Sequence, residues 1–263
     1  MADLDAILGD LDAESQEVDA MVAGLPDAAW ATATPADGWT VAHQIAHLAW
    51  TDEKALISAT TPGEFGEELK RALLAGERYV DEGAAEHAGD PPGALLARWR
   101  ERRDQLRGAL AAFPAGEKLP WYGPAMSPAS MATARMMETW AHGQDIADAL
   151  GLDRRQSARL WHIARFGVRT RDFAFQLHSL APPAEPFRVE LTAPDGDTWT
   201  FGPGDATQRV TGSATGFCHI VTQRRHPGDT DVEAEGADAR EWLRIAQAFA
   251  GQPGQGRREG QFA

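Results

Sequence analysis

The chain has 263 residues, enough for one large domain or two smaller ones that bury a core without cross-links. Its 39 acidic and 25 basic side chains give a formal net charge of -14, which argues against nucleic acid or a membrane as a partner because phosphates would be repelled. Cys218 is the only cysteine, which excludes an internal disulfide, and the N-terminus lacks the apolar run of a secretory signal, so we expect a cytoplasmic protein.

Apolar side chains recur at intervals of three and four residues through the first part of the chain, which predicts amphipathic helices. These helices cover about residues 4–25, 41–60, 64–88 and 93–113. Thr40 is the expected N-cap of the second helix, because its hydroxyl can accept a hydrogen bond from the first turn.

The segment from Pro114 to Pro128 is rich in proline and glycine, so we expect an irregular loop, and loops of this length are often functional. Ser127 or Ser130 is the expected cap of the helix that follows this loop. A further helix at about 156–178 completes an all-helical half.

The composition changes at residues 180–186, where three prolines predict a linker. The pattern beyond it predicts a hairpin, then a helix, a strand and a closing helix, at about residues 187–192, 198–202, 213–223, 231–235 and 237–250. The predicted fold class is therefore α plus α+β. We expect a helical domain over 1–180, a small α+β domain over 187–251 and a flexible tail over 252–263.

Glu138 and His142 are four residues apart in a predicted helix, which places both side chains on one face and within reach of one metal ion. His47, on another predicted helix, would complete a triad of two histidines and one carboxylate. Such a triad leaves coordination positions open for chemistry.

Two alternatives stay open on spacing alone. His43 and His47 are themselves a metal-compatible pair, so a set of three histidines, His43, His47 and His142, could bind the metal with Glu138 as a fourth ligand or a base. A simple hydrogen-bonding role for His43 is the other possibility. Glu138 could instead pair with Arg135, one turn away, while His142 caps the end of its helix.

Two segments, Gly38–Trp50 and Glu138–Asp145, resemble the maleylpyruvate isomerase N-terminal family of the wider DinB-like superfamily. The resemblance covers about residues 4–178 and implies a metal-binding four-helix bundle. It also implies that His47, Glu138 and His142 are the metal ligands, with zinc as the usual ion. Mycothiol, a low-molecular-weight thiol, is the cosubstrate that the resemblance suggests.

The C-terminal half resembles the sterol-carrier-like domain that many of these proteins carry. In the mycothiol-dependent isomerase that domain contributes an arginine near the active site, and Arg224 stands in the comparable stretch here. The resemblance therefore implies a catalytic role for Arg224, and it leaves a catalytic role open for His43. Arg135 and Arg224 are also the arginines that could hold a substrate carboxylate.

A metal ion in such a triad could lower the pKa of a bound thiol or water. Together with this chemistry, the resemblance implies cis-trans isomerisation or thiol transfer on a small electrophile. The thiol would be external, because Cys218 is expected to pack as an apolar residue. Four tryptophans near the ligands in the sequence could wall the substrate pocket: Trp39, Trp50, Trp121 and Trp140.

Other functions remain compatible with the same residues. One is a non-catalytic, metal-stabilised binding or resistance protein for a hydrophobic metabolite. Another is a hydrolase or lyase that uses metal-bound hydroxide. In each case the expected partner is a small molecule and the expected assembly is a monomer or a homodimer.

Overall fold

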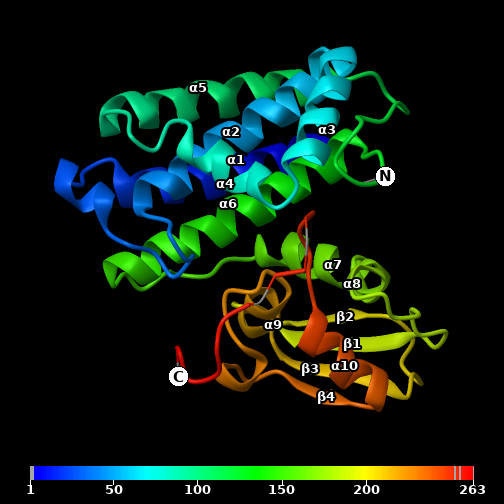
Figure 1. The fold of residues 1–263 in the computed structure, drawn as a ribbon. Helices are drawn as coiled ribbons and strands as arrows, with labels where there is room; N and C mark the ends of the chain where they lie inside the picture. The colour runs from blue at the N-terminus through cyan, green and yellow to red at the C-terminus, as the bar shows by residue number, and fades with distance from the viewer. Residues whose placement is uncertain (1–2, 252, 255, 263) are drawn as a thin grey trace. The chain divides into compact units, whose positions relative to one another are not determined.

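A computed structural model describes residues 3–251, 253–254 and 256–262 of the chain. Within that part the chain divides into two compact units, the first ending at Arg154 and the second beginning at Arg155 (Figure 1). Among these residues, no helix has both the length and the apolar character that crossing a lipid bilayer requires.

The first unit is helical, as the periodicity predicts. Its elements are α1 (Leu4–Val22), the short turn η1 (Asp27–Ala31), α2 (Val41–Thr60), α3 (Pro62–Ala75), α4 (Arg78–Ala85), α5 (Pro92–Ala111) and α6 (Pro128–Leu150). The single helix expected over 64–88 is in fact two helices, α3 and α4. Gly76 ends α3 because it adopts a positive φ of 58°, a conformation that favours glycine.

The four long helices α1, α2, α5 and α6 pack around a shared apolar core and form the predicted four-helix bundle (Figure 1). Val18, Ile45, Leu95 and Ile146 represent these four helices in one part of that core. Gly143 lies inside α6, where a β carbon would stand only 2.6 Å from Val18, so this glycine permits α1 to approach α6 closely.

Helices α2 and α6 begin where their capping residues predict. The backbone N–H of Thr40 donates to Nδ1 of His43 over 3.3 Å, which holds the first turn of α2. Ser127 accepts from the backbone N–H of Ser130 over 3.2 Å at the start of α6. Gly151, with φ of 64°, ends α6, more than two turns after His142.

The second unit contains a four-stranded sheet in the order β2-β1-β3-β4. The strands are β1 (Phe187–Thr192), β2 (Thr198–Phe201), β3 (Gln208–Ser213) and β4 (Glu233–Glu235), and the helices are α7 (Leu160–Arg169), α8 (Arg171–Leu177), α9 (Ala214–Val221) and α10 (Ala237–Ile245), with the turn η2 (Pro227–Asp229). Strands β1 and β2 form the predicted antiparallel hairpin, while β1 and β3 are parallel. The predicted fold class, a helical bundle followed by a small α+β domain, is confirmed.

The boundary between the units differs from the predicted one at residue 180, because α7 and α8 belong to the second unit. Helix α7 packs on α9, where a β carbon at Gly167 would lie 2.8 Å from Val221. Of the tail expected over 252–263, residues 252, 255 and 263 lie outside the described residues. Among the others, the backbone N–H of Gly260 donates to Asp229 over 2.7 Å.

Candidate metal centre

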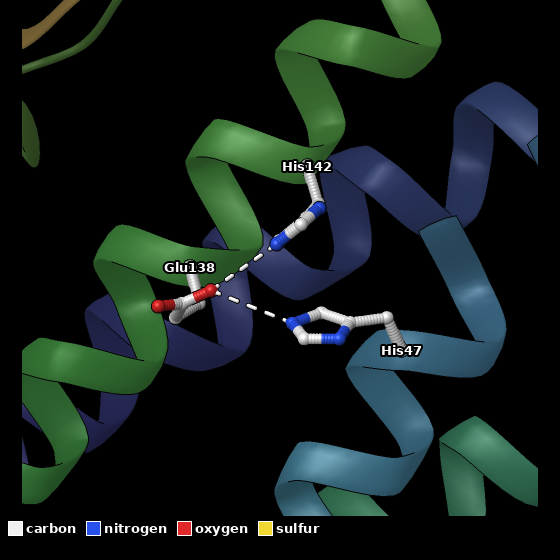
Figure 2. A group of neighbouring side chains, drawn as sticks. All are labelled: His47, Glu138 and His142. Atoms are coloured by element: carbon white, nitrogen blue, oxygen red, sulfur yellow. Dashed lines mark hydrogen bonds and ion pairs between the residues drawn. The ribbon is translucent and has the colours of Figure 1, made fainter. Parts of the chain in front are cut away.

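Helices α2 and α6 bring together three side chains that could hold one metal ion: His47 from α2, and Glu138 and His142 from α6 (Figure 2). Oε2 of Glu138 lies 3.1 Å from Nε2 of His142 and 3.7 Å from Nε2 of His47. The three ligand atoms all lie within 4.8 Å of one another. The two distant segments of the sequence therefore converge, as the motif requires.

This donor set fits a divalent metal ion. In a tetrahedral site with metal-ligand bonds of about 2.0–2.2 Å, ligand atoms stand roughly 3.3–3.6 Å apart. The distances from Glu138 to the two histidines bracket this range. The two histidine nitrogens lie within 4.8 Å of each other, so side-chain rotations would bring all three atoms to one ion.

The alternative in which Glu138 pairs with Arg135 is wrong. Arg135 is 2% exposed, and its Nε donates instead to Oδ1 of Asp52 on α2 over 2.8 Å. A second nitrogen of Arg135 donates to Oγ1 of Thr51 over 2.6 Å. Because these bonds occupy the guanidinium in the bundle interior, Arg135 ties α2 to α6 rather than offering a carboxylate clamp.

The charge on Glu138 depends on its neighbours. Burial by itself would raise its pKa, but hydrogen bonds from His142 and His47 and the positive charge of Arg135 outweigh burial and hold the pKa well below its usual range. Glu138 is therefore ionised at neutral pH, the state in which a carboxylate binds metal.

The two histidines differ in what holds their other ring nitrogen. Nδ1 of His142 lies 2.5 Å from Oε1 of Gln44, a residue of α2 that is fully buried. Nδ1 of His47 is buried and has no hydrogen-bond partner among the described residues. Only His142 therefore has a visible support of the kind that commonly orients a metal-binding imidazole.

Trp39 and Trp50 lie beside the ligands. The ring of Trp39 stacks on His142 at 5.9 Å between centroids and lies 5.1 Å from His47. Its indole N–H donates to Asp81 of α4 over 2.9 Å. Trp50 lies 6.0 Å from His47, so aromatic surface borders the site on two sides.

Trp121 and Trp140 have other surroundings. Trp121 stacks on Phe65 of α3 at 5.6 Å between centroids. Trp140 is 2% exposed, and its ring lies 5.8 Å from the guanidinium carbon of Arg154. Their place in a substrate pocket stays a prediction, whereas contact with the ligand rings is observed for Trp39 and Trp50.

Comparison with known proteins identifies the family of the chain. The family model described as the mycothiol maleylpyruvate isomerase N-terminal domain matches residues 11–147, more than half of the chain. The chain belongs to this family. A second model, described as wyosine base formation, matches residues 183–235 in the second unit.

Two uncharacterized proteins from different strains of Mycobacterium tuberculosis are 56% identical to this family member over 257 residues, covering 98% of this chain and 100% of each relative. Among solved structures, the mycothiol-dependent maleylpyruvate isomerase aligns with a TM-score of 0.58 and 17% identity, over 88% of this chain and 92% of that chain. A mutant of an enzyme with that description, with one histidine replaced by alanine, aligns with a TM-score of 0.61 at the same identity and coverage. At this identity the structural likeness supports a shared fold.

His43 and Arg224 are the remaining predicted site residues of this mycothiol maleylpyruvate isomerase family member. His43 is half-buried at the start of α2, where its Nδ1 accepts from Thr40, and it lies outside the three-residue metal-compatible group found among the described residues. Arg224 belongs to the second unit and donates to the backbone oxygen of Thr222 over 2.7 Å. The catalytic roles assigned to His43 and Arg224 stay predictions.

Sequence reasoning missed Gln44 and Asp52, the residues that support the site. Gln44 interrupts an apolar stripe and lies three residues before His47, so it shares that residue's face of α2. A polar side chain at such a buried position was the available signal. Asp52 offered no comparable signal, because its partner Arg135 is 83 residues away in the sequence.

Proposed function

We propose that this protein is a metal-dependent enzyme of the maleylpyruvate isomerase type. It would use an external thiol, mycothiol being the one that the family's description names, for cis-trans isomerisation of a small electrophile or for thiol transfer to it. One observation carries this proposal: the convergence of His47, Glu138 and His142 within 4.8 Å, at the interface of two helices.

When bound, a divalent ion, which we take to be zinc, would lower the pKa of a thiol or water and polarise a carbonyl oxygen. The chain supplies the two neutral imidazoles and the single carboxylate that hold it. This ligand set leaves the ion a net positive charge and at least one open position, which is what activation of a thiol needs.

The reacting thiol would come from a cosubstrate rather than from the chain. Cys218 is buried in the second unit, where burial raises the pKa of its thiol, and its Sγ faces the backbone oxygen of Leu160 at 3.7 Å. A thiol in that state is a poor nucleophile. We place the reaction in the cytoplasm, where small thiols remain reduced.

Trp39 and Trp50 would position a small planar substrate against the ligands, because their rings border His47. His43 is the proposed proton carrier. Its Nδ1 accepts from Thr40, so the neutral ring holds its proton on Nε2 and can exchange a proton there. Arg224 is the proposed partner of a substrate carboxylate.

Metal analysis combined with a turnover assay tests the proposal. The purified protein is expected to hold about one equivalent of zinc and to consume maleylpyruvate, or an electrophile from a panel, only when mycothiol is present. His47→Ala and Glu138→Ala should lose both the metal and the turnover. Ser58→Ala serves as the matched control and should keep both. It removes a partly buried hydrogen bond to the backbone oxygen of Pro120 from the same helix as His47.

Three results would contradict the proposal. Unchanged zinc content in Glu138→Ala would show that Glu138 is not a metal ligand and would refute the proposed metal site. Binding of substrates without turnover would favour a metal-stabilised binding protein. Turnover that does not depend on a thiol would favour a hydrolase or lyase.

A further inference from the structure

We propose that Gln44 is a positioning residue that fixes the orientation and tautomer of His142, so that Nε2 is the nitrogen offered to the metal. This inference rests on the proposed metal-dependent function. It adds a residue that acts on the site through another residue and does not itself bind the metal.

The side chains of Gln44 and His142 are in direct contact. Gln44 is fully buried, and its Oε1 lies 2.5 Å from Nδ1 of His142. An amide oxygen only accepts hydrogen bonds, so Nδ1 of His142 carries a proton and donates it to Gln44. The remaining nitrogen, Nε2, faces Oε2 of Glu138 at 3.1 Å.

The neighbours of the Gln44 amide fix its orientation, although its oxygen and nitrogen could in principle exchange places. Nε2 of Gln44 donates to Oγ1 of Thr34 over 2.8 Å. That hydroxyl donates its own proton to the backbone oxygen of Trp39 over 3.0 Å, so it presents a lone pair to Gln44. The amide must therefore turn its nitrogen to Thr34 and its oxygen to His142.

Thr34 is itself anchored within the loop that precedes α2. Its backbone N–H also donates to the backbone oxygen of Trp39, over 2.8 Å, and Ala33 pairs with Thr40 in an isolated β-bridge. The same short loop carries the Trp39 ring that stacks on His142. One loop before α2 thus holds both the aromatic side of the site and the chain of hydrogen bonds that ends on a ligand.

The expected consequence is measurable as metal affinity. Loss of a partner that orients a metal-binding histidine typically weakens binding roughly 10- to 100-fold. Gln44→Leu removes the acceptor and should weaken zinc binding within that range. Gln44→Glu keeps an acceptor for Nδ1–H, of the carboxylate kind that commonly supports metal-binding histidines, and should weaken zinc binding less than Gln44→Leu does.

The experiment measures zinc affinity of the full chain by competition with a chelator, together with ¹⁵N NMR of histidine-labelled, zinc-loaded protein. In the unchanged protein and in Gln44→Glu, the Nδ1–H proton of His142 should be visible and protected from solvent exchange. In Gln44→Leu that signal should be lost or should exchange rapidly. Ser58→Ala controls for the loss of a buried polar contact elsewhere on α2 and should alter neither readout.

Equal zinc affinity in Gln44→Leu and the unchanged protein would overturn the inference. Equal losses in Gln44→Leu and Gln44→Glu would also overturn it, because they would indicate a general packing role. If Gln44→Leu does not fold, Thr34→Val replaces it in the experiment. Thr34→Val removes the acceptor for the Gln44 nitrogen and so lets the amide rotate, and unchanged zinc affinity in this variant would refute the proposal. If the unchanged protein binds no zinc, the proposed function itself fails, which is a different result.

Discussion

The buried ion pair between Arg135 and Asp52 leads to a sharp prediction about stability. Both side chains are almost fully buried, at 2% and 6% exposure, and the pair joins α6 to α2 close to the metal ligands. Asp52 also accepts from the indole N–H of Trp99 over 3.2 Å. Asp52→Ala would remove both contacts and leave the guanidinium without its charged partner.

The size of the effect follows from these contacts. A hydrogen bond to a charged group contributes about 1.5–3 kcal/mol, and a neutral one about 0.5–1.5 kcal/mol. Breaking a buried ion pair from one side costs about 3–5 kcal/mol, because the remaining charge has no partner. We therefore expect the free energy of unfolding to fall by about 3–5 kcal/mol in Asp52→Ala.

The assay is urea unfolding of the metal-free protein, followed by tryptophan fluorescence. The double variant Asp52→Ala with Arg135→Met removes the buried charge as well, and should recover part of the loss. A decrease below about 1 kcal/mol in Asp52→Ala would refute the reasoning, since that is the effect of an exposed pair. A double variant less stable than Asp52→Ala would refute it too, because Arg135 would then stabilise the bundle without Asp52.

Three further outcomes are expected. Hydrogen bonding from Arg100 is the main cause that lowers the pKa of Asp19. The stabilisation that Asp19→Asn removes should therefore be fully present above about pH 4 and should vanish as the pH falls through the lowered pKa. Urea unfolding of both proteins at several pH values measures this, and a difference in stability that stays constant with pH would contradict it. Zinc at about 100 times its dissociation constant should stabilise the protein by about 2.7 kcal/mol, and thermal unfolding should show no such gain in Glu138→Ala. Cys218, buried and with a raised pKa, should react with a thiol reagent at least about tenfold more slowly in the native protein than in urea; equal rates would refute its packed state.

The helices of the bundle could be predicted because their signals lie in short stretches of sequence. Apolar residues at helical spacing identify the long helices, and capping residues such as Thr40 and Ser127 identify where two of them begin. The division of the 64–88 segment escaped prediction because it depends on the backbone conformation of Gly76. Strand β3 escaped because Val210 is its only buried residue, so the sequence there shows little alternation.

The metal ligands could be predicted in part for the same reason. Glu138 and His142 are one turn apart, so their convergence is a property of a single helix. The addition of His47 required the packing of α2 on α6, which spacing could suggest but not decide. The support of His142 by Gln44 and Thr34 depends on contacts across 98 and 10 residues and on the direction of each hydrogen bond.

Metal ligands and the residues that support them differ in how far a sequence can reveal them. Residues that bind a metal are restricted to few chemical types and short spacings, so a sequence can reveal them. A supporting amide such as Gln44 is restricted only by its geometry, because glutamine occurs at many positions without any such role. The structure is needed to identify its role, because it shows the amide oxygen accepting from His142 and the amide nitrogen donating to Thr34. The most informative substitution is therefore Gln44→Leu, which removes the hydrogen-bond acceptor for His142, compared with Gln44→Glu, which keeps an acceptor at the same position.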